Sequence, residues 1–255
     1  FRNLIKEDSQ LKEKRLNLET TSFSLHLRAM IFMLCDHLWG TIVSGNDWLT
    51  CIGRLTFPLY AFMIVEGYFH TKNLKNYAGR LLLFAVLSEI PFNLAMGSRL
   101  FYPIHQNVLW SFLISIGLIH WNEKMKGKQI WKRILVAAAS ICIGTLAGIL
   151  TFVDFYQAGI LTVLAFYFFR GKKWWCYLGQ LVLLYYINIE ILGGIGRDVS
   201  VFGLRFFLHR QAFALLALIP IWLYRGKQGL RSKSLQYTYY AFYPVHLLLL
   251  GIIKF

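Results

Sequence analysis

The stretch WLTCIGRLTFPLYAFMIVEGYF, residues Trp48–Phe69, decides the class of fold because it is long and carries only two charges, Arg54 and Glu66. The hydrocarbon core of a bilayer is about 30 Å thick and takes about 20 helical residues to cross. The stretch has that length, and it predicts a transmembrane helix.

Apolar segments flank this stretch on both sides, and each predicts a further membrane-spanning helix. They are Ser22–Val43, Ala78–Met96, Ile104–Trp121, Ile134–Val153, Phe155–Phe169, Trp174–Leu192, Phe206–Leu223 and Gln236–Ile253. We therefore expect an all-α fold, a polytopic integral membrane helical bundle of about nine transmembrane helices. Residues 1–20 are expected to form a polar cytoplasmic leader, and residues 21–255 a single transmembrane domain.

The composition of the 255 residues excludes an ordinary soluble protein. Hydrophobic residues make up 57% of the chain and charged residues 15%, and the mean hydropathy is +0.50. A water-facing surface takes about 25–35% charged residues. Much of this chain must therefore face lipid.

The net charge of +15 is spread unevenly over the connections between the apolar segments. Lys and Arg gather in alternate connections, beginning with the leader, and basic connections stay on the cytoplasmic side of a membrane. We expect a multi-pass protein of the bacterial cytoplasmic membrane, with the N-terminus in the cytoplasm and the C-terminus outside. Its surroundings are then the lipid bilayer, and because the positive charge is explained in this way we expect no nucleic-acid partner.

Ionisable and polar residues inside the predicted spans are candidates for function, because a charge in the hydrocarbon region is costly. Most of them fall at mid-membrane or in the outer half, which predicts one water-accessible cavity open to the outside. These residues are Asp36, His37, Arg54, Glu89, Asn93, His105, Asn107, Tyr243 and His246. A second group near the inner edge suits a phosphate-bearing cytoplasmic ligand, although ordinary basic loops look the same. It comprises His26, Arg28, Glu66, His70, Lys72 and Arg80.

The outer group contains the residue types of an acid–base catalytic site. Adjacent helical residues point about 100° apart, so Asp36 and His37 cannot face one another, and one of them is expected to turn inward and find its partner on another helix. A histidine can remove a proton from a hydroxyl or amine at neutral pH, and Arg54 can stabilise a developing oxyanion. Asn107 and Tyr243 can donate hydrogen bonds to the same oxygen. The histidines lack the spacing of a zinc site, and we expect no metal.

Several segments are similar to one known family. They are MIFMLCDHLW (Met30–Trp39), IGRLTFPLYAFMIVEGYFHT (Ile52–Thr71), LLLFAVLSEIPFNL (Leu81–Leu94), HQNVLW (His105–Trp110), QAFALLALIPIWLYRGKQG (Gln211–Gly229) and YYAFYPVHLLLL (Tyr239–Leu250). Together, and in this order, they resemble the TraX family over nearly the whole chain from residue 26 onward. That family is named for a conjugative-pilus protein that N-acetylates pilin, and it is related to membrane-bound acyltransferases.

The resemblance implies an acyltransferase-like domain that moves acetyl from cytoplasmic acetyl-CoA to an extracytoplasmic acceptor. The acceptor would be the hydroxyl or amine of a saccharide, a cell-envelope polymer or a protein N-terminus. Family motifs cover Asp36, His37, Arg54, Glu66, Glu89, His105, Asn107, Tyr243 and His246. The chain departs from the family at Asp154–Gly159, where the family often has Asp-Tyr-Gly-x-x-Gly, and at Arg28, where an apolar residue is usual.

On this basis we expect three sets of site residues. The catalytic set is His37, Asp36, Arg54, Glu89, His105 and Asn107. The set that binds acetyl-CoA is His26, Arg28, Glu66, His70, Lys72 and Arg80. The set that binds the acceptor is Asn93, Tyr243 and His246.

Two other functions fit the same residues. A proton-coupled transporter or flippase could use Asp36, His37 and Glu89 as a proton relay. A scaffold protein could use polar pairs only to hold its helices together. The chain shows no internal repeat, which stands against a transporter built from inverted repeats.

Overall fold

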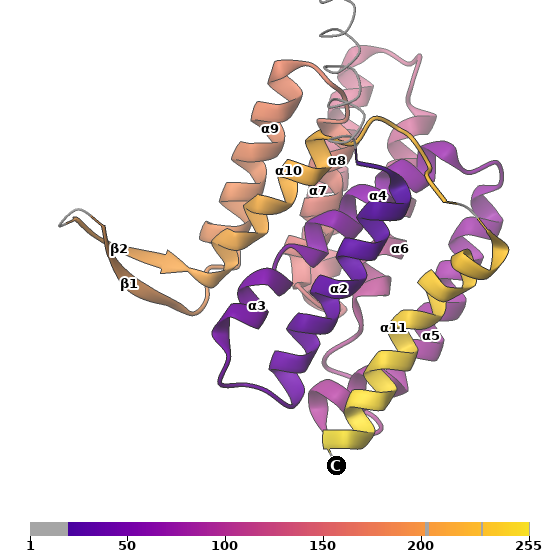
Figure 1. Cartoon of the computed structure of the whole chain (residues 1–255). Coiled ribbons are helices and arrows are strands. Elements are labelled where there is room, and N and C mark those ends of the chain that lie inside the picture. The colour runs from indigo at the N-terminus through magenta and orange to yellow at the C-terminus, as the bar shows by residue number, and fades with distance from the viewer. Residues whose placement is uncertain (1–19, 202–203, 231, 255) are drawn as a thin grey trace, which may run out of the picture.

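The computed structural model describes residues 20–201, 204–230 and 232–254. The predicted leader at residues 1–20 falls almost wholly outside the described residues. Helices make up most of the described part (Figure 1).

Helices follow one another along the chain, and one pair of strands interrupts them in the second half. The first half contains α2 (Ser22–Thr41), α3 (Asp47–Gly53), α4 (Thr56–His70), α5 (Leu74–Gly97), α6 (Val108–Lys124) and α7 (Ile130–Leu150). The second half contains α8 (Tyr156–Phe168), α9 (Trp174–Tyr185), the π-helix η1 (Tyr186–Ile191), β1 (Gly196–Val201), β2 (Leu204–His209), the 3-10 helix η2 (Arg210–Ala217), α10 (Leu218–Trp222) and α11 (Lys233–Lys254).

Polar side chains determine where several helices begin. The Thr21 side chain accepts a hydrogen bond from the backbone of Ser24, and the Ser24 side chain accepts one from Thr21 in return. Asn73 and Asn107 cap α5 and α6 in the same position. Such caps satisfy amide groups that have no partner within the helix, so the starts of these three helices are encoded locally.

Each predicted span coincides with at least one helix, but nine spans are not confirmed. Among the described residues, three helical segments are long and apolar enough to cross a membrane, namely Asp47–His70, Leu74–Gly97 and Ile130–Leu150. Helices α6 and α8 have only 17 and 13 residues, fewer than the roughly 20 of a perpendicular span. The three long apolar helices indicate a membrane protein.

The expectation of an all-α fold is wrong at one place. Strands β1 and β2 form an antiparallel pair, which we call the hairpin, in which Gly196 pairs with His209 and Ser200 with Arg205. The predicted eighth span therefore does not begin as a helix at Phe206. Gly193 and Gly194 adopt positive φ just before the hairpin, a conformation that glycine reaches without strain and that ends the preceding helix.

Helix α8 lies at the centre of the bundle and contacts α4, α6, α7 and α9. Ile160, Val163, Leu164 and Phe166 of this helix are each at most 1% exposed. Helix α11 lies beside α2 and α5 (Figure 1). These three helices run in parallel, so the last helix of the chain packs between two of the first.

The connections meet at two ends of the bundle. At one, which we call the Asp36 end, Gln106 and Val153 form a β-bridge between the segments that precede α6 and α8. At the other, the Glu66 end, Arg170 follows α8 and forms an ion pair with Glu66 of α4. Large apolar side chains cover the outside between the ends, for example Ile134 and Ile253, exposed by 62% and 66%. An apolar exterior of this kind fits a lipid environment.

Candidate active site

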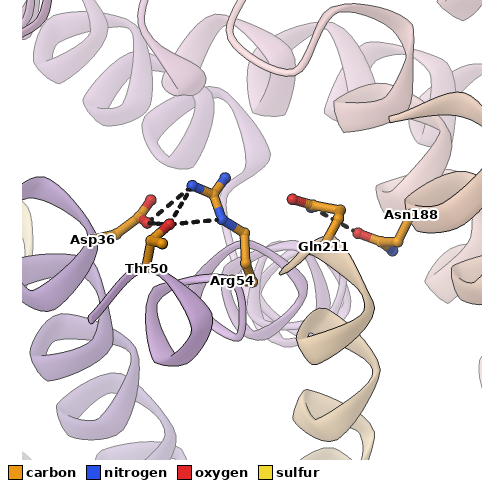
Figure 2. Close-up of polar contacts among 5 residues, drawn as sticks. All are labelled: Asp36, Thr50, Arg54, Asn188 and Gln211. Carbon is orange, nitrogen blue, oxygen red and sulfur yellow. Dashed lines mark hydrogen bonds and ion pairs between the residues drawn. The ribbon is translucent and has the colours of Figure 1, made fainter. Parts of the chain in front are cut away.

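Asp36 forms a compact polar group with two residues from the α3 region. The Thr50 hydroxyl donates to Asp36 Oδ1 at 2.8 Å, and Nη2 of Arg54 donates to the same oxygen at 3.1 Å. Nη2 and Nε of Arg54 also donate to the Thr50 hydroxyl, at 2.6 and 3.2 Å. Figure 2 shows all three side chains converging. Nη1 of Arg54 has no hydrogen bond to any residue that the structure describes, so it is available to a ligand.

Gly53 allows this convergence. A Cβ atom at this position would lie 2.6 Å from Asp36 Oδ1 and 2.7 Å from Asp36 Cγ. Any side chain at residue 53 would therefore push α3 away from α2. The close approach of α2 and α3 therefore depends on the glycine at residue 53.

The far side of Arg54 carries further polar groups. Gln211 donates to Asn188 Oδ1 at 2.9 Å (Figure 2), and Asn188 donates to the Leu184 carbonyl at 2.8 Å. Asp47 accepts hydrogen bonds from Arg197 and Arg210 at 2.9 and 2.7 Å. These contacts join α3, the hairpin and η2 at the Asp36 end.

His37 forms a hydrogen bond with His246 of α11, with 2.6 Å between Nδ1 and Nε2. His246 Nδ1 lies 2.6 Å from the Phe242 carbonyl oxygen. A carbonyl oxygen only accepts, so Nδ1 of His246 carries the hydrogen, and Nε2 of neutral His246 accepts from His37 Nδ1. Neutral His37 then has an unprotonated Nε2, which can act as a base.

Glu89 is held by three donors from the start of α6. Its Oε1 accepts from the Asn107 backbone and side-chain amides at 3.2 and 2.5 Å and from Trp110 Nε1 at 2.6 Å. Asn107 Nδ2 also donates to the Ala85 carbonyl at 2.8 Å. Both side-chain amide hydrogens of Asn107 are thus used, so the expected donation from Asn107 to a substrate oxyanion does not fit this geometry.

His105 and Asp154 form a carboxylate–histidine pair, with 3.4 Å between Nε2 and Oδ1. The hydrogen bond to Asp154 raises the pKa of His105, which lies outside the helices, in the connection before α6. Ser111 holds the backbone of Asp154 through a hydrogen bond of 3.1 Å to its carbonyl oxygen. We did not include Asp154 in the expected site, although an acid within an apolar sequence was a usable signal.

These groups form one neighbourhood. The charge of Arg54 acts on His37, and Asp154 interacts electrostatically with Asp36 and Tyr243. Tyr243 and His246 are 7% and 6% exposed. Sequence reasoning identified most members but missed Thr50 and Trp110, because uncharged side chains do not stand out in an apolar stretch. Asn93 is also buried, and its Oδ1 has no partner among the described residues.

A cavity of about 380 Å³ extends from the Glu66 end toward this neighbourhood. Its walls come from α2, α4, α5, α6, α11 and the segment Tyr224–Leu230, which we call the strap. The strap is bound to the start of α2, where the backbone amides of Ser22 and Phe23 donate to the carbonyls of Lys227 and Gln228 at 2.9 and 3.1 Å. At its deep end the cavity reaches Tyr243, whose ring centroid is 6.3 Å from that of His37.

The family described as "TraX protein" matches residues 24–254. The chain belongs to the TraX family. It is also 30% identical, over 92% of its length and 96% of the relative's, to a protein named "Probable fimbrial assembly protein FimC, serogroup H1" from Dichelobacter nodosus. No solved structure matches it significantly.

In this TraX family chain, the residues expected to bind acetyl-CoA divide into two sets. His26, Glu66 and His70 line the cavity. Arg80 donates to the hydroxyl of Tyr240, a lining residue, at 3.4 Å. Arg28 and Lys72 are exposed and do not line the cavity.

Glu66 is paired at the rim of the cavity. Arg170 donates to its two carboxylate oxygens at 2.7 and 3.3 Å. Burial, followed by the charge of Glu66, raises the pKa of Tyr224 in the strap, so its phenol stays protonated. Within the described part of the chain, no group of three or more His, Cys, Asp or Glu residues could hold a metal ion.

Proposed function

We propose that the protein is a membrane-embedded acetyltransferase. It moves acetyl from cytoplasmic acetyl-CoA to the hydroxyl or amine of an extracytoplasmic acceptor, which is a saccharide, a cell-envelope polymer or a protein N-terminus. The observation that carries the proposal is the position of the deep end of the cavity next to the His37–His246 pair. A ligand that enters at the Glu66 end can bring its reactive group to a histidine base.

The residues have distinct parts in the reaction. His37 Nε2 takes the proton of the acceptor, whose oxygen or nitrogen forms a bond to the thioester carbonyl carbon. Nη1 of Arg54 stabilises the oxyanion that develops on the carbonyl oxygen. The carbon–sulfur bond then breaks, and the proton held by His37 passes to the leaving sulfur, which gives free CoA and the acetylated acceptor.

Asp36 and His246 act as positioning residues. Asp36 and Thr50 fix the guanidinium of Arg54, and His246 fixes the tautomer of His37. His105 and Asp154 lie at the Asp36 end, where we place the entry of the acceptor. The name of the Dichelobacter nodosus relative refers to fimbrial assembly, which favours a protein amine as the acceptor.

The proposal also fixes an orientation. The Glu66 end lies in the cytoplasm, and the Asp36 end lies at the outer side of the bacterial cytoplasmic membrane. The basic connections then lie beside the mouth of the cavity, where Arg80 and Lys72 can attract the phosphates of CoA.

The test uses the purified protein in liposomes with acetyl-CoA labelled in the acetyl group. We expect thioester loss with the wild type and none with a folded His37→Ala variant. His120→Ala is the matched control, since His120 contacts Tyr68, with 3.1 Å between Nδ1 and the hydroxyl oxygen, and takes no part in the site. Absence of acetyl-CoA binding, together with solute movement driven by a proton gradient, would contradict the proposal and support a transporter.

A further inference from the structure

The cavity has a closed end. On α11 its lining residues include Tyr239 and Tyr240 and extend no further than Tyr243, and on α2 they extend no further than Met33. On α4 they run from Tyr60 to His70, a distance of about 15 Å at 1.5 Å per residue. The cavity is therefore elongated, and at the Glu66 end its lining includes the exposed His70.

Packing holds the end wall in place. Met33 and Tyr243 are 6% and 7% exposed and belong to one buried cluster with Phe92, Ala95 and Leu247. The Tyr243 side chain also interacts with the backbone at Val108, which starts α6. A wall fixed by four helices, α2, α5, α6 and α11, yields little to a longer ligand.

A second layer supports the wall from behind. Phe112 lines the cavity, and its ring stacks on Phe57 with 5.6 Å between centroids. Phe57 stacks in turn on Phe155 at 4.5 Å. These stacked rings pack behind Phe112 on the α4–α6 side of the cavity.

The position of Tyr243 links the wall to the reaction. Its ring lies 6.3 Å from His37 and 6.0 Å from His246, measured between centroids. The two histidines do not line the cavity themselves, so an acyl group inside it stops against Tyr243 and Met33, with the thioester carbonyl on the cavity side of these residues. Each added methylene would either overpack the wall or draw the thioester carbonyl back from His37.

We propose that Met33 and Tyr243 select the acyl chain, so that the site accepts acetyl and rejects longer acyl groups. This inference rests on the proposed transfer from an acyl-CoA. Tyr243, which the sequence analysis assigned to acceptor binding, thereby also limits the length of the acyl chain. Met33, which the sequence analysis did not select, has the same role. A single methylene in a close-fitting pocket changes kcat/KM by roughly 10- to 200-fold.

The experiment measures kcat/KM for acetyl-, propionyl-, butyryl- and hexanoyl-CoA with the protein in liposomes. We expect kcat/KM of the wild type to fall by roughly 10-fold or more with each methylene added to the acyl chain. Met33→Ala and Tyr243→Ala should each raise the ratio of butyryl to acetyl activity by about 10-fold or more. Tyr243→Phe keeps the ring and should keep the wild-type ratio.

Met63→Ala is the matched control, because Met63 also lines the cavity but lies on its side wall, within α4. It should keep the wild-type ratio of butyryl to acetyl activity, whatever its absolute rate. If Tyr243→Ala does not fold, Met33→Ala alone tests the wall from the α2 side.

The outcomes separate the two proposals. A wild type that uses butyryl-CoA as well as acetyl-CoA, or a Met33→Ala variant with an unchanged ratio, would overturn the selection of acyl length and leave acyl transfer standing. A wild type that consumes no acyl-CoA would overturn the proposed function itself.

Discussion

His246 accepts a hydrogen bond from His37 across 2.6 Å and donates from its other nitrogen to the Phe242 carbonyl. The two rings stack at 9°, with 4.9 Å between centroids. One residue of α11 therefore determines which nitrogen of an α2 residue can take up a proton.

Replacement of His246 tests this dependence. We expect His246→Ala to lower kcat by about 100-fold or more, since His37 loses the acceptor that fixes its tautomer. His246→Gln should retain more activity, because its amide oxygen can also accept from His37 Nδ1. The measurement is kcat and KM for acetyl-CoA in each variant. An Ala variant as active as the Gln variant would show that the contact only packs the helices.

Substitutions of Asp36 and Arg54 test whether their ion pair stabilises the fold or takes part in the reaction. We expect Asp36→Ala to destabilise the protein by about 1–3 kcal/mol, since it leaves the Arg54 guanidinium without its carboxylate. The double variant Asp36→Ala/Arg54→Leu should recover much of that stability, because an apolar pair needs no hydrogen bonds. Thermal unfolding in detergent measures this.

Activity distinguishes the two roles. The double variant should stay inactive despite its recovered stability, because it lacks the guanidinium that we propose to stabilise the oxyanion. A stable double variant with wild-type activity would support a scaffold role for the pair.

Gly53→Ala should move α3 away from Asp36 and destabilise the protein by about 1–3 kcal/mol, since the added methyl group overlaps the Asp36 carboxylate. Gly79→Ala is the control, because a Cβ atom at this helical position meets nothing within 4 Å. That change should be neutral or stabilising by up to about 1 kcal/mol. Equal effects of the two substitutions would argue against the close approach at Gly53.

The His105–Asp154 pair predicts a pH dependence of stability. The pKa of His105 is raised above its ordinary value of 6.5, chiefly by the hydrogen bond to Asp154. The pair therefore stabilises the folded protein fully below that ordinary value and ceases to do so as the pH rises through the raised pKa. Both side chains are about one-third exposed, 33% and 28%, so the contribution is about 1 kcal/mol or less.

Thermal unfolding of the wild type and of His105→Gln at several pH values measures this contribution. The difference in Tm between the two proteins should be largest below about pH 6.5 and should shrink as the pH rises through the raised pKa of His105. A constant difference across this range would mean that the pair does not carry a charge.

Sequence reasoning placed the helices well because apolar length is a strong signal. It also expected one of Asp36 and His37 to find a partner on another helix, whereas in the fold both have partners outside α2, Arg54 and His246. The predicted number of nine membrane crossings is not confirmed, since several helices are shorter than the hydrocarbon core of a bilayer is thick. Hydropathy also predicted a span from Phe206 and could not reveal strand pairing with residues 196–201, which lie earlier in the chain.

The role of Asn107 shows a second limit. A sequence places an amide near a carboxylate but does not say how its hydrogens are shared. In the fold, Glu89 and Ala85 take both of them. The contribution of Trp110 was missed for a related reason, because an indole N–H counts as apolar in a hydropathy pattern although it donates to Glu89.

The parallel packing of α11 between α2 and α5 has a consequence for biosynthesis. The ribosome delivers α11 after α2 and α5, so the helices that α11 packs against are synthesised before it. Until Tyr243 and His246 arrive, the cavity has no end wall and His37 lacks its partner. A chain that stops before residue 233 lacks α11, so it cannot form the contact between His37 and His246.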